Sequence, residues 1–187
     1  MEITSNEIKI DRELSELDKF ARDFCKILEK HTKYVIVSGY VSILLGRSRS
    51  SEDIDILVPV MDDFAWNKIY ADLIKNDYYC INSEGSKDSY NCLNDGIAVR
   101  FAPEDVVIPN MEVLFAKEKV QKIALETAIN VTIGKDNFII SNIELQIAYK
   151  EKVLKSPKDI EDARHLRMVL GKAINTQELK KYQAMLK

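Results

Sequence analysis

The sequence predicts a mixed α/β (α+β) domain in which a small mixed sheet is flanked by helices and followed by C-terminal helices. Two observations lead to this fold class. Short β-branched runs alternate with amphipathic helical stripes over residues 1–140, and the pattern from residue 141 onward is wholly helical. We therefore expect one α/β domain over residues 1–140. The helical segment 141–187 should pack on it, because its apolar stripes are too short to form an independent core.

Each element rests on hydrophobic periodicity and on local start and stop signals. The predicted strands are residues 34–37, 53–58, 78–81, 97–101, 111–115, 131–133 and 138–140. The predicted helices are residues 14–28, 41–46, 62–74, 117–127, 142–155, 156–169 and 176–185. The polar, Gly-containing segment 82–96 is expected to be an irregular excursion with a helical turn.

Composition excludes several classes of protein. Of the 187 residues 46% are hydrophobic, which excludes a disordered chain. The 27 Lys plus Arg against 30 Asp plus Glu argue against a basic protein that covers nucleic acid by electrostatic attraction. No apolar run is long enough to span a membrane, and the polar, acidic N-terminus is not a signal or transit peptide. The three widely spaced cysteines predict neither a zinc site nor a disulfide framework. We expect a soluble, cytoplasmic protein of unknown oligomeric state.

The passage that carries chemistry spans residues 35–58. It runs from a strand through a Gly turn, a short helix and an Arg/Ser loop to a strand with two acids. Because side chains alternate along a strand, Asp53 and Asp55 project from one face, roughly 6–7 Å apart along the backbone. Two such carboxylates can converge on a pair of divalent ions ~3.5–4 Å apart, which clamps the attacking and leaving oxygens of a phosphoryl transfer. Hard oxygen ligands favour Mg²⁺.

The Gly turn before the short helix supplies groups that can hold phosphates. Gly39 lets phosphate oxygens approach the backbone, and the helix that follows offers free N–H groups and a positive dipole end. Ser38 adds a hydroxyl donor. Arg47 and Arg49 stand in the loop between this turn and the acidic strand, where an anionic substrate would lie. The alternative is that both arginines are plain surface residues.

This order of residues resembles the signature of the nucleotidyltransferase superfamily related to DNA polymerase β. That signature is a Gly followed by Gly or Ser, a spacer, and an acid–hydrophobic–acid–hydrophobic strand. Here Gly39 and Tyr40 precede a spacer of twelve residues and then Asp53-Ile54-Asp55-Ile56. Ser38-Gly39 is the alternative small pair. Tyr40 departs from the signature, because it would bring a bulky side chain close to the phosphates.

The C-terminal pattern is similar to that of nucleotidyltransferases of the abortive-infection antitoxin–toxin type and their archaeal relatives. It consists of ELQIAYKEKVL (144–154) followed by SPKDIEDARHL (156–166). The relatives carry a similar lysine-bearing helix, so the resemblance implies that Lys150 contributes to nucleotide binding. A toxin–antitoxin role is implied by resemblance alone. The alternatives are that Lys150 is solvated and that Asp159 and Asp162 only complement a helix N-terminus.

The resemblance implies an enzyme that uses Mg²⁺ (or Mn²⁺) to move a nucleoside monophosphate from an NTP to RNA, protein or a small molecule. Asp53 and Asp55 would bind the metal. A third acid is expected on a neighbouring strand, and Glu112 is our candidate because a charge amid apolar neighbours needs a partner or a metal. Glu112 would complete the metal site and help deprotonate the acceptor, although an ion pair with Arg100 is the structural alternative.

Two further readings of the whole chain stay open at this point. One is a catalytically idle nucleotidyltransferase-like module that binds a nucleotide or a protein partner. The other is a structural α/β domain whose acidic strand is simply solvated. The complete pair of aspartates argues against the idle module, because an idle relative has no chemical need for both acids. The structural domain would be excluded by a structure in which Asp53, Asp55 and Glu112 converge on one cleft.

Overall fold

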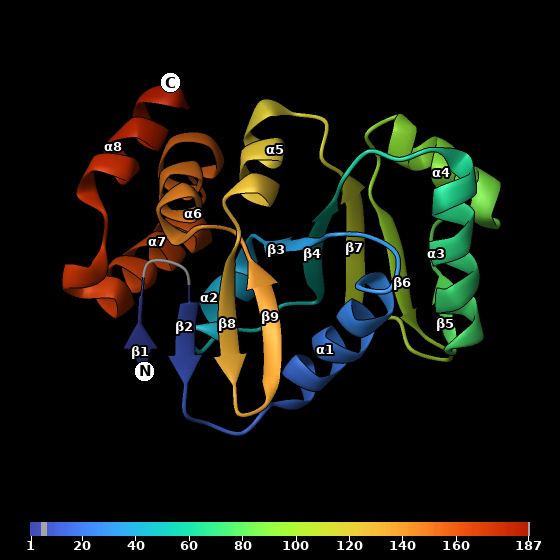
Figure 1. Ribbon diagram of the computed structural model, residues 1–187, viewed down its shortest axis with the longest axis horizontal. Helices are drawn as coiled ribbons and strands as arrows, with labels where there is room; N and C mark the ends of the chain where they lie inside the picture. The colour runs from blue at the N-terminus through green and yellow to red at the C-terminus, as the bar shows by residue number, and fades with distance from the viewer. Residues whose placement is uncertain (5–6, 187) are drawn as a thin grey trace.

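The computed structural model describes residues 1–4 and 7–186, which build one nine-stranded mixed sheet with helices around it (Figure 1). The strand order is β1-β2-β8-β9-β3-β4-β7-β6-β5. The strands are β1 (Glu2–Ile3), β2 (Glu7–Ile10), β3 (Val35–Val37), β4 (Asp53–Val58), β5 (Tyr78–Cys80), β6 (Val99–Pro103), β7 (Asn110–Phe115), β8 (Ile129–Ile133) and β9 (Asp136–Ile140). The fold class predicted from the sequence is confirmed.

The helices surround this sheet, and the C-terminal ones gather near its β1–β2 edge, at the left of Figure 1. They are α1 (Glu16–Leu28), α2 (Gly39–Leu44), α3 (Asp63–Lys75), α4 (Ser86–Asn94), α5 (Lys119–Glu126), α6 (Ile143–Tyr149), α7 (Pro157–Leu170) and α8 (Thr176–Met185). A π-helical turn, η1 (Lys150–Leu154), continues α6, and a 3₁₀ turn, η2 (Gly171–Ala173), continues α7. No helix among the described residues combines the length and apolar character that crossing a bilayer requires.

Three elements differ from the sequence-based expectation. Segment 82–96 was expected to be irregular, yet it contains the helix α4. Only Ser89 and Leu93 of α4 are buried, so the helix leaves too thin an apolar stripe to be read from periodicity. The strands β1 and β2 were not predicted either. β2 forms because Ile8 pairs in parallel with Val131 of β8, a partner that lies far away in the sequence.

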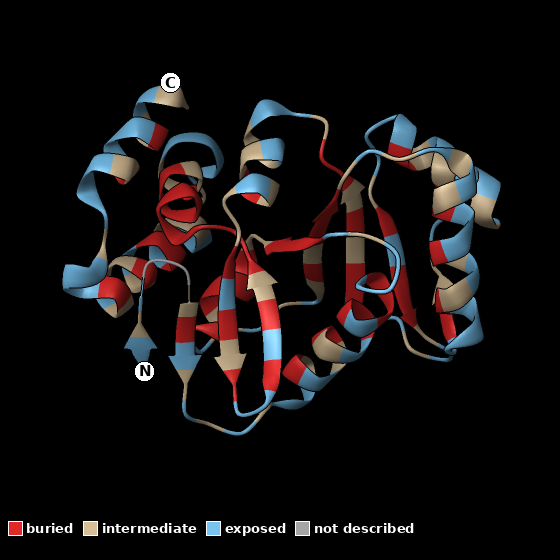
Figure 2. Cartoon of the chain, viewed as in Figure 1, coloured by how far each residue is buried: buried red, intermediate tan, exposed pale blue. Residues whose placement is uncertain are grey.

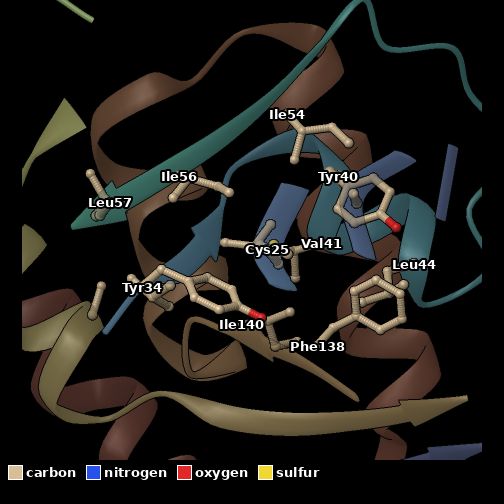
Figure 3. Packing of buried hydrophobic residues seen from close by; sticks show 14 of the residues in the cluster. Cys25, Tyr34, Tyr40, Val41, Leu44, Ile54, Ile56, Leu57, Phe138 and Ile140 are labelled. Carbon is tan, nitrogen blue, oxygen red and sulfur yellow. The ribbon is translucent and has the colours of Figure 1, made fainter. Parts of the chain in front are cut away.

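The main core lies where α1 and α2 meet the central strands (Figure 3). Ile54 and Ile56 of β4 point into this core, and Cys25 of α1 is buried beside them. Leu57 belongs to the other face of β4, since successive strand residues alternate. One strand therefore supplies both a wall of the core and, on its opposite face, the two aspartates.

A buried carboxylate ties α1 to α2. Asp18 accepts hydrogen bonds from the Arg12 guanidinium at 2.5 Å, the Ser15 hydroxyl at 2.7 Å and the Tyr40 hydroxyl at 2.7 Å. The Tyr40 side chain is fully buried and its hydroxyl points to Asp18, so the expectation that this side chain lies close to the phosphates is wrong. Burial raises the pKa of Asp18, but the hydrogen bonds from Arg12, Tyr40 and Ser15 outweigh it and hold the pKa below its ordinary value.

We expect Asp18→Asn to lower the free energy of unfolding by about 2–4 kcal/mol at pH 7, because it leaves Arg12 and Tyr40 without their charged acceptor. The folded pKa of Asp18 is lowered, so its contribution is complete above the unfolded pKa of ~3.9 and is lost as pH falls through the folded pKa. The deficit of the variant should therefore shrink in acid. Urea unfolding at several pH values measures it.

The matched control is Glu16→Gln, which removes the same charge from the first turn of α1 at an exposed position. It should change stability by less than about 0.5 kcal/mol. An equal loss in both variants, or a deficit of Asp18→Asn that does not change between pH 7 and pH 2, would contradict this account of Asp18.

Candidate active site

The two aspartates of β4 lie beside Glu112 of β7. β4 pairs antiparallel with β3 and parallel with β7, and the parallel register sets Asp55 opposite Glu112 and Asp53 opposite Asn110. The expectation that the Asp53–Val58 strand neighbours the strand with Glu112 is confirmed. Because directly paired residues of adjacent strands point to the same face, all three acids belong to the face of β4 opposite its core residues.

Negative charge is crowded at Asp55. Burial raises the pKa of Asp55 to about 6, and the charges of Asp53 and Glu112 act in the same direction. A hydrogen bond from the Ser38 side chain and the positive charge of Lys150 oppose them. The surroundings of Asp55 therefore disfavour its ionised form, and a cation placed among the three acids would relieve their repulsion.

Glu112 is engaged with a cation of the neighbouring strand. In the β6–β7 register Arg100 faces Glu112, and the Arg100 guanidinium donates to the Glu112 carboxylate at 2.5 Å. Among residues 1–4 and 7–186 no three His, Cys, Asp or Glu side chains are placed so that they could hold a metal ion. The ion pair with Arg100 that the sequence offered as an alternative role of Glu112 is thus present.

The turn between β3 and α2 is held from two sides. Ser38 has a φ of 63°, which is strained for a residue other than glycine, and its backbone N–H donates to the Gln146 side chain of α6 at 3.1 Å. At Gly39 an added Cβ would lie 3.0 Å from a guanidinium nitrogen of Arg49. A side chain at position 39 would therefore be in tight contact with the Arg49 guanidinium, which would have to shift to admit it.

Arg47, Arg49 and Lys150 converge on one buried carboxylate. Lys150 and Arg49 each donate to Asp162 at 2.8 Å, and Arg47 donates to the same carboxylate. Lys150 and Asp162 are both fully buried, so the alternatives of a solvated Lys150 and of plain surface arginines are wrong. Burial raises the pKa of Asp162, but Lys150, Arg47 and Arg49 outweigh it and hold the pKa below its ordinary value.

This cation cluster, defined as Arg47, Arg49, Lys150 and their acids Asp162 and Asp159, has an excess of positive charge. Asp159 lies 3.5 Å from Lys150, so three cations face two carboxylates. Asp159 also takes part in the predicted start of α7, where its backbone N–H donates to the Ser156 hydroxyl. Asp162 does not simply complement the helix N-terminus, because its side chain accepts from two arginines of a distant loop.

A cavity of about 240 Å³ opens beside the acids. Of the predicted site residues, Ser38, Asp55 and Glu112 line it. The remaining predicted residues, Asp53, Gly39, Arg47, Arg49 and Lys150, are not part of its wall. The structure therefore brings the predicted residues into two neighbouring groups, which are the acids at the cavity and the cation cluster at the Ser38–Gly39 turn.

Sequence reasoning missed the roles of Gln146 and Asp162. Gln146 lies in α6, which is buried along almost its whole length (Figure 2), and no periodic signal marks one residue of such a helix. Asp162 did carry a signal, since it precedes Leu166 by four residues on the apolar stripe of α7. An acid on a buried stripe indicates a buried ion pair.

No family model and no curated protein matches the sequence. Solved structures do match the fold. A crystal structure of an antigenic nucleotidyltransferase-like protein from Paracoccidioides brasiliensis is 18% identical, with 90% of this chain and 85% of that chain covered and a TM-score of 0.56. The solution structure of the antibiotic-resistance factor ANT(2″)-Ia is 13% identical, with 89% of each chain covered and a TM-score of 0.56.

A crystal structure of ANT(2″)-Ia in complex with adenylyl-2″-tobramycin is similar as well. It is 14% identical, with 92% of this chain and 97% of that chain covered and a TM-score of 0.58. At such identities the likeness establishes the fold, and it does not transfer an activity or an acceptor. The resemblance read from the sequence is thereby confirmed for the fold, while the antitoxin–toxin type stays a prediction. The chain has a nucleotidyltransferase-like fold.

Proposed function

We propose that this protein is a divalent-metal-dependent nucleotidyltransferase that moves a nucleoside monophosphate from an NTP to a hydroxyl acceptor. The observation that carries the proposal is the β4–β7 register, which sets Asp55 opposite Glu112 with Asp53 on the same face, beside a cavity. An acid pair in this position of a nucleotidyltransferase-like fold has a chemical use that a solvated strand lacks.

Asp53 and Asp55 are suited to hold Mg²⁺ or Mn²⁺. Their oxygens are the hard ligands that these ions prefer. Burial and the charges of Asp53 and Glu112 raise the pKa of Asp55, and a bound cation would relieve the repulsion between these acids. When bound, the ion would neutralise charge that develops on the transferred phosphate and on the leaving oxygen. In this proposal Glu112 joins Asp53 and Asp55 after its ion pair with Arg100 breaks.

The cation cluster would bind the triphosphate. Arg49 lies across Gly39, so phosphates at this turn would meet a guanidinium and backbone N–H groups together. Asp162 holds Arg49 and Lys150 in place, and the excess positive charge of the cluster matches an anionic ligand. Ser38, whose side chain hydrogen-bonds to Asp55, would connect the phosphates to the acids.

Glu112 would act as the base for the acceptor. Its carboxylate takes the proton of the acceptor hydroxyl, whose oxygen attacks the α-phosphorus of the NTP. The bond from that phosphorus to the β-phosphate oxygen breaks, and pyrophosphate leaves with its electron pair. The chain of events needs no group other than the substrates, the metal and the acids already described.

The catalytically idle module is the second candidate, and the Arg100–Glu112 ion pair is the observation that favours it. In an idle module Glu112 would have only this structural partner. The two candidates differ in label transfer. The test is to incubate the protein with each α-labelled NTP, Mg²⁺ and cellular RNA, protein or small molecules; transfer to any acceptor supports the enzyme.

We expect Asp55→Asn to lower turnover by a factor of roughly 10²–10³, because it removes one carboxylate charge from the proposed metal site while nearly preserving shape. The rate of label transfer measures the effect. Glu52→Gln is the matched control, since it removes the same charge from the exposed residue that precedes Asp53. Undiminished transfer by the Asp55→Asn protein would remove Asp55 from the mechanism.

The pKa of Asp55 predicts a stability effect that needs no acceptor. Its folded pKa of about 6 lies above the unfolded value, so ionised Asp55 costs folding free energy as pH rises from ~4 through 6. Without metal, Asp55→Asn should therefore be more stable than wild type by about 1–3 kcal/mol at pH 7.5 and equal to it near pH 4. Thermal or urea unfolding across this pH range measures the difference.

Mg²⁺ should reverse this order. It should raise the unfolding temperature of wild type and of Glu52→Gln at pH 7.5, and it should leave Asp55→Asn nearly unchanged, because a ligand stabilises only the state that binds it. An Asp55→Asn protein that is stabilised by Mg²⁺ as much as wild type would show that the ion binds elsewhere.

A further inference from the structure

The cavity lies on the Glu112 side of the site, apart from the cation cluster. Its wall includes Asp55 and Glu112 but none of Arg47, Arg49 and Lys150. In the proposed reaction the triphosphate must reach the cations, whereas the acceptor hydroxyl must reach Glu112. This inference rests on the proposed function: the cavity would bind the acceptor, and the phosphates would bind at the cation cluster.

The wall of the cavity is apolar and comes from three parts of the fold. The sheet, α5 and the C-terminal helices contribute the main apolar side chains, which are Leu57, Leu114, Val120, Ala124, Leu145 and Leu154. Asp55 and Glu112 are the only charged side chains among the described residues that line it. A charged group placed deeper in the cavity would lose water without gaining a counter-charge, which is costly.

Two glutamine side chains of the wall use their oxygen atoms in contacts within the protein. The Gln121 side-chain oxygen accepts the backbone N–H groups of Lys117 and Glu118 at the start of α5. The Gln146 side-chain oxygen accepts the backbone N–H of Ser38. These contacts fix α5 and the Ser38 turn around the cavity, so the wall is preformed and offers an occupant mainly apolar surface.

Size narrows the occupant further. At about 240 Å³ the cavity is smaller than the ~300–1,000 Å³ that drug-sized ligands occupy, so it suits a compact body of one or two rings. A polycation of several linked rings is too large for this volume. Its ammonium groups would also meet only two carboxylates in the lining, those of Asp55 and Glu112.

We propose that this cavity is the acceptor pocket and that it takes a small, uncharged, mainly apolar alcohol. The ring body lies under α5, and the hydroxyl reaches Glu112. Glu112 takes the hydroxyl proton, the alcohol oxygen bonds to the α-phosphorus of the NTP, and the bond to the departing pyrophosphate breaks. The product is a nucleoside monophosphate ester of the alcohol.

Binding tests the pocket without catalysis. Three uncharged aromatic alcohols (benzyl alcohol, 2-phenylethanol and indole-3-ethanol) and the polycation tobramycin are titrated into the protein and followed by saturation-transfer NMR and calorimetry. Ala124→Phe and Ala98→Leu each fill the cavity from a different side, and Ala71→Phe adds the same ring at an exposed position of α3. Circular dichroism verifies that each variant is folded.

At least one aromatic alcohol should bind saturably to wild type and to Ala71→Phe. Its affinity for Ala124→Phe and for Ala98→Leu should be about tenfold lower, which is the scale of a lost apolar contact. Tobramycin should not bind saturably. The complex of Mg²⁺ with α,β-methylene-ATP should bind all four proteins equally and should not displace the alcohol. Displacement of the alcohol by the nucleotide would show that the cavity binds the nucleoside of the donor, and it would overturn the assignment as acceptor pocket. Unchanged alcohol binding in both filled variants would overturn it as well.

Label transfer separates this inference from the proposed function. Transfer from an α-labelled NTP to an aromatic alcohol, lost in the filled variants, supports both. Transfer to a different acceptor that the filled variants leave undiminished overturns the pocket alone. If alcohols bind but wild type labels no acceptor at all, the proposed function fails, and with it the acceptor role of the cavity.

Discussion

The arrangement of the site depends on one buried carboxylate, that of Asp162. A carboxylate out of contact with water costs several kcal/mol unless charged partners surround it, and here the partners come from η1 and from the loop after α2. The ion pairs with Arg49 and Arg47 join residues more than a hundred positions apart in the sequence. Ala163, Leu166 and Leu170 pack α7 into the core, and the ion pairs of Asp162 fix this helix against the loop after α2.

β4 imposes the second constraint, because its two faces have opposite chemistry. Ile54 and Ile56 must enter the core, and the strand period of two then turns Asp53 and Asp55 to the other face. A slip of one residue would bury both acids and expose both isoleucines, so the stability of the core enforces the position of the acids. Stability and site chemistry conflict at Asp55, where burial, together with the charges of Asp53 and Glu112, raises the pKa to about 6.

Local patterns were sufficient for most of the fold and for the two aspartates. The β4 strand and its paired acids follow from alternation over a few residues. The burial of Lys150 could not be predicted in the same way, because it depends on Asp162, which Arg47 and Arg49 also contact from a loop more than a hundred residues away in the sequence. α4 and the β2–β8 pairing were missed for a similar reason, since non-local contacts decide them.

The fold leaves the chemistry of the acceptor open, and the lining of the cavity narrows it. ANT(2″)-Ia shares this fold and is known in complex with adenylyl-2″-tobramycin, yet sharing a fold does not carry over an acceptor. In the proposed reaction the surface next to Glu112 would select the acceptor. Among the described residues that line the cavity, Glu112 and Asp55 are the charged ones, and the other lining side chains are neutral. Charge would thus be confined to the reacting groups, and the body of the acceptor would be recognised by shape and by the water it displaces.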